Sequence, residues 1–515
     1  MLAKLDKIFL SDKYIVTFFL ITAYLQELAP VYAKVAHVYM MPIILASFCV
    51  LYRYLRAPGF FHSRGTGLWT IYVLAFALSF VANGFIEPRQ NLVYLALSLI
   101  NAVAFFWVDG RRSGISVEEE MRSISGIALI ILTVNSIISM TLYLSGFSKY
   151  FVDRNNGFWT FIGHQQFENR FVGLEGSPNP LGWLCFGAIA CAVIYLSLTE
   201  SSKKTRRIAV YVSILFNYIC LGLTLSRGSL IAVASGCVAY LLFYTVVSRG
   251  NRSITKNVAI VLLGTVLTVA VILASIFIFA DATSRISAGW TSDTTASQQK
   301  TDNASSADSG TSSDTAATSG DTQISSNRFT STRDVSNGRI LINIIGYKIL
   351  KYNDQMIFGV SPGDGPGAWH RFMDEHSEEV ASSKYEYVRT SPKIVADMHN
   401  LFTQSLFYLG VVGLIAVILL VCLLADAVIK MFRRPDIVKN KRFAAALIFL
   451  IFGYGFIAMF DNIVLFSMNI YDLLFVVSFG RFVFIEADGE ERRSWICRID
   501  DLVRKPLTRL EVRKR

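Results

Sequence analysis

Apolar segments long enough to cross a lipid bilayer recur along most of this chain of 515 residues. The hydrocarbon core of a bilayer is about 30 Å thick, and a helix needs about 20 apolar residues to cross it. Only 17% of the residues are charged, whereas soluble domains average about 25%. We therefore predict an all-α integral membrane protein with about 12 transmembrane helices. The apolar segments lie approximately at 14–33, 38–55, 66–83, 91–108, 124–145, 179–198, 208–225, 228–246, 257–280, 402–429, 443–463 and 464–484.

Lysine and arginine side chains indicate the orientation, because the cytoplasmic loops of membrane proteins carry an excess of them. If the N-terminus is cytoplasmic, the basic connections all fall on the cytoplasmic side. These connections lie at 53–64, 111–122, 203–207, 249–256, 433–442 and 492–515. We therefore expect both termini in the cytoplasm. The net charge of +11 is mostly this excess, so it does not indicate a nucleic-acid partner.

Two connections on the predicted outer side are long, at 146–178 and 281–400. The connection 146–178 joins two of the first nine helices, and we place these nine helices within 1–280. Within the second, 291–325 is rich in Ser, Thr and Asp and predicts a flexible exposed insert, whereas 333–400 has helical periodicity and turn signals and predicts a folded segment. Helices ten to twelve then occupy 401–484, and a basic cytoplasmic tail occupies 485–515. We thus expect a large, partly helical extracytoplasmic loop.

Arg227 lies in the stretch LTLSRGSLIA, at the predicted outer junction of helices seven and eight, without an acidic residue beside it in the sequence. A guanidinium at this boundary costs a few kcal/mol unless it reaches headgroups, forms a pair or lines a wet cavity. Its planar set of donors matches a phosphate group. Arg227 is therefore a candidate phosphate ligand, and an arginine that only reaches the lipid headgroups is the alternative.

Arg170 and Asn179 come shortly before and at the start of helix six, in the stretch ENRFVGLEGSPNPLGW. The prolines and glycines of this stretch predict a turn and a helix start whose backbone amides point outward, where they can bind an anion. An ordinary entry into a helix is the alternative. Arg339 begins an amphipathic helix in the folded part of the large loop, and by itself it indicates only a solvated charge.

His399 and Asn400 stand at the outer mouth of helix ten. An imidazole titrates near neutrality and can take a proton from a hydroxyl group. A histidine at a membrane interface can equally be an anchor. Other groups on the predicted outer side compete for the role of base, namely His37, His164, His370, His376 and the carboxylate of Glu27.

The order of these motifs resembles the O-antigen ligase and polymerase family. The shared features are a Pro-Asn turn at a helix start, T-x-S-R-G between two spans, a large outer loop with an early arginine, and H-N before a span with YLGVVGL. The resemblance covers roughly residues 165–420. The Ser-rich insert departs from the compact loops of the ligases. The R-x10-G pattern of some polymerases is also absent at Arg170, since Gly182 comes one position late.

The resemblance implies a fold similar to the GT-C class of membrane glycosyltransferases and a site on the outer side of the bacterial inner membrane. It implies that Arg227 and Arg339 bind the diphosphate of an undecaprenyl-diphosphate-linked oligosaccharide, that Arg170 assists, and that His399 is the base. Asn179 and Asn400 are then expected to contact substrate. The donor is already activated, so we expect no metal, no ATP and no cofactor. Membrane lipid and a chain-length regulator protein are further expected partners.

Three functions fit these features. The first is a polymerase that transfers glycan from its carrier to the hydroxyl of the next lipid-linked repeat unit, with inversion at the anomeric carbon. The second is a ligase that transfers finished polysaccharide to lipid A core or another acceptor. The third is a transporter or flippase for a lipid-linked anion. A transporter predicts charges near the middle of the membrane, whereas the candidate arginines lie at the outer face, which favours an enzyme.

Overall fold

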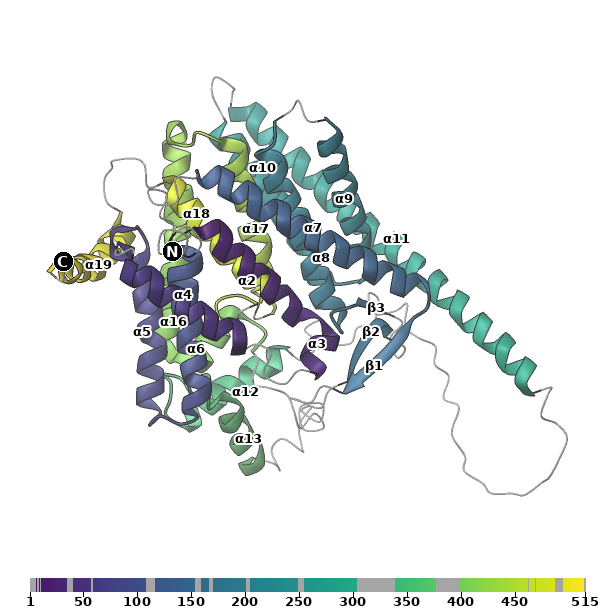
Figure 1. Ribbon diagram of the computed structural model, residues 1–515, viewed down its shortest axis with the longest axis horizontal. Helices are drawn as coiled ribbons and strands as arrows, with labels where there is room; N and C mark the ends of the chain where they lie inside the picture. Colours follow the sequence, from purple (N-terminus) through teal and green to yellow (C-terminus); the bar gives the residue numbers. More distant parts are fainter. Residues whose placement is uncertain are drawn as a thin grey trace.

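The computed structural model describes residues 6–513, except for 7, 8, 10, 35–39, 57–58, 108–115, 153–158, 166–169, 201–203, 249–253, 303–338, 377–397, 462, 468 and 487–493. The helices form a bundle, and the small sheet, α12 and α13 gather at one end of it (Figure 1). We name this end the outer end, following the orientation predicted from the sequence, and we name the opposite end the inner end.

The helices follow the apolar segments of the sequence. They are α2 (Asp12–Glu27), α3 (Ala29–Lys34), α4 (Met40–Arg56), η1 (Phe60–His62), α5 (Thr66–Ala82), α6 (Pro88–Ile100), η2 (Asn101–Phe106), α7 (Val117–Leu144), α8 (Pro178–Ser197), α9 (Lys204–Leu223), α10 (Arg227–Val247), α11 (Ile254–Asp302), α12 (Arg339–Tyr352), α13 (Gly365–Glu375), α16 (Leu401–Arg433), η4 (Pro435–Ile437), α17 (Lys441–Ile457), α18 (Ile470–Glu486) and α19 (Trp495–Arg513).

Each of the predicted spans coincides with at least one of these helices. Within the described residues, 7 helices are long and apolar enough to cross a membrane by themselves. Others are shorter: α5, α17 and α18 have 17 residues each, and α2 has 16. The chain is therefore a mainly helical membrane protein, while the number of 12 spans and the GT-C likeness stay predictions.

The outer connection 146–178 differs from the all-α expectation, because it contains an antiparallel sheet of three strands. The strands are β1 (Ser148–Val152), β2 (Trp159–Gln165) and β3 (Arg170–Gly173), in the order β1-β2-β3. Their aromatic and β-branched residues favour strands. Gly163 takes a left-handed φ of 85° at an irregular pairing position, where a Cβ would lie 1.9 Å from the Phe147 carbonyl oxygen. The sheet leads the chain directly into α8.

Helix α11 also differs from expectation, because it continues to Asp302. The first part of the predicted insert, 291–302, therefore has a helical backbone, while its flexibility stays a prediction. This part contains no proline to end the helix, and helix propagation adds a hydrogen bond for each residue fixed. The remainder of the insert, 303–325, lies outside the described residues. The folded part of the large loop is described over 339–376.

Helices α10 and α17 pack against each other in opposite directions near the centre of the molecule. A Cβ on Gly236 of α10 would lie 2.8 Å from the carbonyl oxygen of Phe449 in α17, so glycine permits this close approach. At the inner end Arg442 bonds Tyr244. When these two pairs, Gly236–Phe449 and Tyr244–Arg442, are continued toward the outer end, the first residue of α10, Arg227, lies at the level of Ala458, just after α17.

Helix α16 is interrupted at Gly410, which has a φ of 65°. A segment of the large loop fills this break, because Val411 N donates to the Met356 carbonyl at 2.9 Å and Val360 N donates to the Phe407 carbonyl at 2.9 Å. A Cβ on Gly410 would lie 2.2 Å from the Ile357 carbonyl oxygen. The YLGVVGL motif thus fastens the large loop to the membrane helices.

The basic tail folds as α19 and contacts the start of α5. The Asp500 carboxylate accepts hydrogen bonds from Gly65 N at 3.0 Å, Gly67 N at 2.8 Å and Leu68 N at 3.2 Å. This carboxylate satisfies amides at a helix N-terminus. The tail therefore lies against the basic connection 53–64, on the side that the sequence assigns to the cytoplasm.

Candidate active site

The turn before α10 places Arg227 at the first residue of that helix, at its outer end. Leu225 has a left-handed φ of 52°, a conformation that costs about 1–3 kcal/mol for a residue other than glycine. Ser226 is the N-cap, but its hydroxyl bonds that of Ser229 at 2.9 Å and gives α10 no side-chain cap. The N-cap side chain therefore does not accept from the first amides of α10, as in helix starts that bind anions.

The start of α8 packs beside this turn. Its N-cap, Ser177, likewise forms no side-chain cap hydrogen bond, and half-buried Asn179 lies in its first turn. A Cβ on Gly182 would lie 2.5 Å from Ser229 Oγ and 3.0 Å from Ser226 Cβ. Gly182 thus allows the two helix starts to lie side by side, so that both dipoles point their positive ends outward.

Arg170 joins these helix starts as the first residue of β3. Its Nη2 donates to the Thr224 carbonyl at 3.3 Å, in the turn that leads to Arg227. The structure therefore brings together three of the residues that the sequence selected. Arg170, Asn179 and Arg227 lie at one corner of the outer end together with the N-termini of α8 and α10, and we call this region the positive corner.

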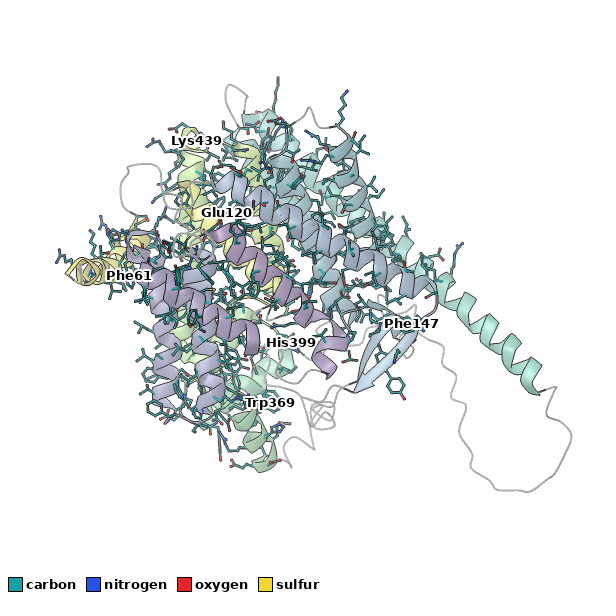
Figure 2. The ribbon with its side chains drawn as sticks, in the orientation of Figure 1. Phe61, Glu120, Phe147, Trp369, His399 and Lys439 are labelled. Carbon is teal, nitrogen blue, oxygen red and sulfur yellow. The ribbon has the colours of Figure 1, made fainter. Side chains whose placement is uncertain are left out.

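His399 lies just before α16, with a left-handed φ of 48°. Its Nδ1 is 3.1 Å from Asp461 Oδ1, and the exposed side-chain fractions are 34% for His399 and 14% for Asp461. A carboxylate at Nδ1 fixes the tautomer and leaves Nε2 as the proton acceptor. Figure 2 shows His399 in the outer part of the molecule with Trp369 of α13, far from Lys439 at the inner end.

The peptide groups around His399 connect it to the positive corner. Leu401 N donates to the Ala458 carbonyl at 2.8 Å, and the register of α10 and α17 sets Arg227 at the level of Ala458. The outer end of α17 therefore lies between the histidine and the arginine. His399 and Arg227 therefore belong to the same outer end of the bundle.

Asn400 has a structural role that the sequence prediction did not include. Its Oδ1 accepts from Phe402 N at 2.9 Å and from Thr403 N at 3.2 Å, which caps α16. Its Nδ2 donates to the Met459 carbonyl at 2.7 Å. The amide therefore orients the chain beside His399, and a contact of Asn400 with substrate stays a prediction.

Arg339 is the first residue of α12, and the structure describes its backbone only. Further along this helix, a Cβ on Gly346 would lie 2.5 Å from Met398 Sδ. Helix α12 thus packs directly on the residue before His399. Arg339 stands at the N-terminus of α12, two turns from that contact, and its role in binding a diphosphate stays a prediction.

The competing histidines are less suited to act as a base. His164 is only 8% exposed, its Nδ1 is 3.4 Å from the Phe147 carbonyl oxygen, and burial lowers its pKa. His376 stacks on Phe372 with 4.2 Å between ring centroids. His370 lies on an exposed face of α13, and His37 lies outside the described residues.

Glu175 is a buried acidic residue next to the positive corner, and its role could not be predicted from the sequence. Its Oε1 accepts from Asn135 Nδ2 at 2.5 Å, and Asn135 Oδ1 accepts from the Tyr24 hydroxyl at 3.0 Å. Nearby, the Tyr471 hydroxyl lies 3.2 Å from the Pro180 carbonyl oxygen and 3.4 Å from Glu27 Oε2. These contacts tie the chain between β3 and α8 to α2, α7 and α18.

Glu27, the alternative base, is therefore part of this supporting network. Burial raises the pKa of the Glu175 carboxyl to about 8, and the Asn135 amide opposes the rise. Asp461, like Glu175, is a residue whose role becomes visible only in the structure. The sequence places it at the outer end of a span, but its pairing with His399 depends on how α16 and α17 pack.

Part of the chain is similar to a known protein family. Residues 209–418 match a family model described as O-antigen ligase, and the matched segment includes Arg227, Arg339, His399 and Asn400. No curated protein matches the chain. Members of the family are glycosyltransferase-like membrane enzymes that act on lipid-linked glycans. Residues 209–418 are therefore similar to this family, which supports the resemblance drawn from the sequence motifs.

Proposed function

We propose that this protein is a polysaccharide polymerase that transfers glycan from an undecaprenyl-diphosphate carrier to the hydroxyl of the next lipid-linked repeat unit. One observation carries the proposal: two helix N-termini without side-chain caps lie side by side at the outer end, next to Arg170 and Arg227. Such a site suits a diphosphate.

The reaction needs charge stabilisation and one proton transfer. The bond between the anomeric carbon and the diphosphate oxygen breaks, and the acceptor oxygen bonds that carbon from the opposite face, with inversion. His399 accepts the proton of the acceptor hydroxyl, and Asp461 stabilises the imidazolium that results. Negative charge grows on the departing undecaprenyl diphosphate, where Arg227, Arg170 and the helix amides stabilise it.

A ligase is the second candidate, because the matching family model is described as O-antigen ligase. The same donor site serves both reactions, and only the acceptor differs. Purified protein supplied with lipid-linked repeat units alone distinguishes them: a ladder of products indicates a polymerase. Product that forms only after addition of a lipid A core acceptor indicates a ligase.

Two substitutions test the donor site and the base. We expect Arg227→Ala and His399→Ala each to lower turnover by about 10²–10³, with normal membrane insertion and thermal stability. Arg207→Ala is the matched control, since Arg207 bonds Tyr211 near the start of α9. Turnover that stays near normal in both active-site variants would refute the proposed chemistry.

Asp461→Asn tests the pairing with His399. Loss of the carboxylate removes the group that holds the imidazole tautomer, so turnover falls while the apparent affinity for the lipid-linked donor is unchanged. A change in donor affinity alone would show that Asp461 acts on binding and not on the base.

A further inference from the structure

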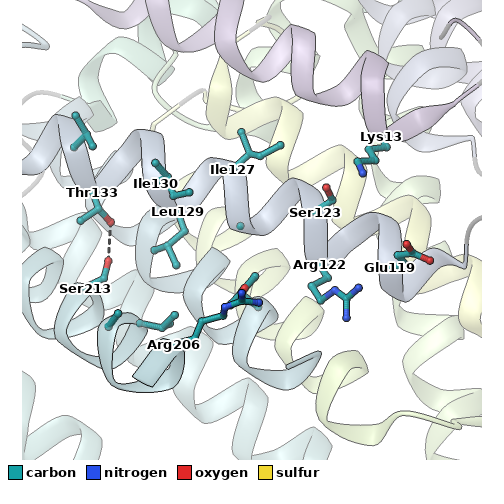
Figure 3. A pocket seen from close by; sticks show the side chains of 15 residues that line it. Lys13, Glu119, Arg122, Ser123, Ile127, Leu129, Ile130, Thr133, Arg206 and Ser213 are labelled. Atoms are coloured by element: carbon teal, nitrogen blue, oxygen red, sulfur yellow. Dashed lines mark hydrogen bonds between the residues drawn. The ribbon is translucent and has the colours of Figure 1, made fainter. Parts of the chain in front are cut away.

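A cavity begins at the inner end, away from the proposed active site. It has a volume of about 710 Å³ and lies mainly between α7 and α9 (Figure 3). Cavities of about 300–1,000 Å³ are typical of small-molecule sites. The side chains that line it are arranged by polarity along its length.

The polar part of the cavity holds three cations from three helices. Lys13 comes from the first turn of α2, Arg122 from the second turn of α7 and Arg206 from the first turn of α9. Glu119 is the acidic residue among the lining side chains. The balance is therefore positive, and it lies where the sequence predicts the cytoplasmic ends of the three helices.

The other part of the cavity is apolar and open to the side of the bundle. Ile127, Leu129 and Ile130 line it, and Ile130 is 65% exposed. A hydrogen bond of 2.6 Å between Thr133 and Ser213 joins α7 to α9 at its far end. The rise of a helix from Arg122 to Thr133 is about 16 Å, so the apolar wall is long enough for much of an acyl chain.

We propose that this cavity binds an anionic glycerophospholipid of the leaflet at the inner end. The phosphate lies among Lys13, Arg122 and Arg206, and one acyl chain lies along the apolar wall between α7 and α9. Basic pockets between transmembrane helices at the cytoplasmic side bind anionic headgroups in this way. The combination of clustered cations and an exposed apolar wall distinguishes this site from the isolated basic residues that set topology.

The proposal does not depend on the glycosyltransferase function, because the cations of the cavity and the positive corner lie at opposite ends of the bundle. The apolar part of the cavity nevertheless extends along α7 to Val134, next to Asn135, which donates to Glu175. A bound lipid would therefore stabilise α7, which also supports the proposed active site through Asn135.

Lipid binding to the purified full chain provides the test, with phosphatidylglycerol and phosphatidylcholine titrated separately and bound lipid counted by native mass spectrometry. We expect preferential retention of phosphatidylglycerol. Each cation near the surface contributes about fivefold in affinity, so Arg122→Ala with Arg206→Ala lowers it about thirtyfold. Arg207→Ala combined with Lys204→Ala removes the same charge at the start of α9 outside the lining, and should change affinity little.

A second variant separates the cavity from general surface charge. Ala209→Phe places a ring in the apolar part, because Ala209 lines the cavity, while every cation is kept. We expect it to reduce phosphatidylglycerol retention as well. Equal retention of both lipids, an equal loss in the control pair, or full retention in Ala209→Phe would each overturn the proposal.

Discussion

The inner and outer ends of the bundle use arginine in different ways. At the inner end Arg481 is fully buried, and its Nη2 lies 3.2 Å from Asp12 Oδ2 and 3.4 Å from Glu120 Oε2. Arg481 also donates to the Phe105 carbonyl at 2.5 Å, and Arg53 forms a second ion pair with Asp12. These charges neutralise one another and connect α2, α4, α7 and α18.

At the outer end the arginines are half-buried and lie beside helix starts. Arg170 donates to a backbone carbonyl, and Arg227 begins α10. The nearby carboxylate of Glu175 accepts from an amide side chain. Guanidinium groups beside helix N-termini near a surface can meet negative charge from outside. The inner cluster is therefore a structural element, whereas the outer cluster has the properties of a binding site.

The largest expected effect is on the inner cluster. Arg481→Met leaves Asp12 and Glu120 buried without their shared partner, and breaking a buried ion pair costs about 3–5 kcal/mol. We expect a large loss in the free energy of unfolding and poor yield of folded protein, measured by thermal unfolding in detergent.

Arg227→Met is the matched substitution at the outer end, and its effect on stability should be small. If both variants lose comparable stability, the comparison between the two ends fails. If neither loses stability, the inner cluster is not structural.

The next effect concerns Glu175 and pH. Its pKa rises from 4.5 to about 8 in the folded state because of burial, so folding favours the neutral carboxyl. The unfolded chain releases this proton first, and the free energy of unfolding therefore falls as pH rises from about 4.5 to about 8. Glu175→Gln keeps an acceptor for Asn135 and removes the titration.

Thermal unfolding at about pH 5 and about pH 9 measures this difference. The wild-type protein should lose stability on the order of a few kcal/mol more than the variant over this range. Equal slopes for both proteins would show that the Glu175 carboxyl is already solvated and does not support the site in neutral form.

The sequence predicted the outer site in part, because helix starts and membrane orientation leave local signals. The S-R-G and Pro-Asn motifs identify residues that do lie together at the ends of α10 and α8. The lengths of the apolar segments predicted both helices that carry these motifs. These features depend on neighbours in the chain or on the side of the membrane, and both can be inferred from one sequence.

Other features depend on packing between distant segments. Asp461 meets His399, and Glu175 meets Asn135, only after the bundle forms. Arg481 looked unremarkable within its apolar segment, because its partners Asp12 and Glu120 belong to other helices. The sheet between α7 and α8 lies in the long connection 146–178, where strand signals compete with turn residues, so the strands could not be predicted from the sequence.

The smallest effect on stability concerns Gly228, and it sharpens the contrast between structure and site. A Cβ at Gly228 would have no neighbour within 4 Å among the described residues, and its φ lies outside the left-handed range that favours glycine. Neither packing nor backbone conformation therefore requires glycine here.

Alanine in a helix is more stable than glycine by about 0.5–1 kcal/mol, so Gly228→Ala should raise the unfolding temperature slightly. A diphosphate that approaches the first amides of α10 would meet the added methyl group, and turnover should fall. Gly455 in α17, where a Cβ would find its nearest neighbour at 3.9 Å, provides a control: Gly455→Ala should leave turnover unchanged. Full activity of Gly228→Ala would mean that the ligand does not approach this helix start, and the donor site would then have to rest on α8 and Arg170.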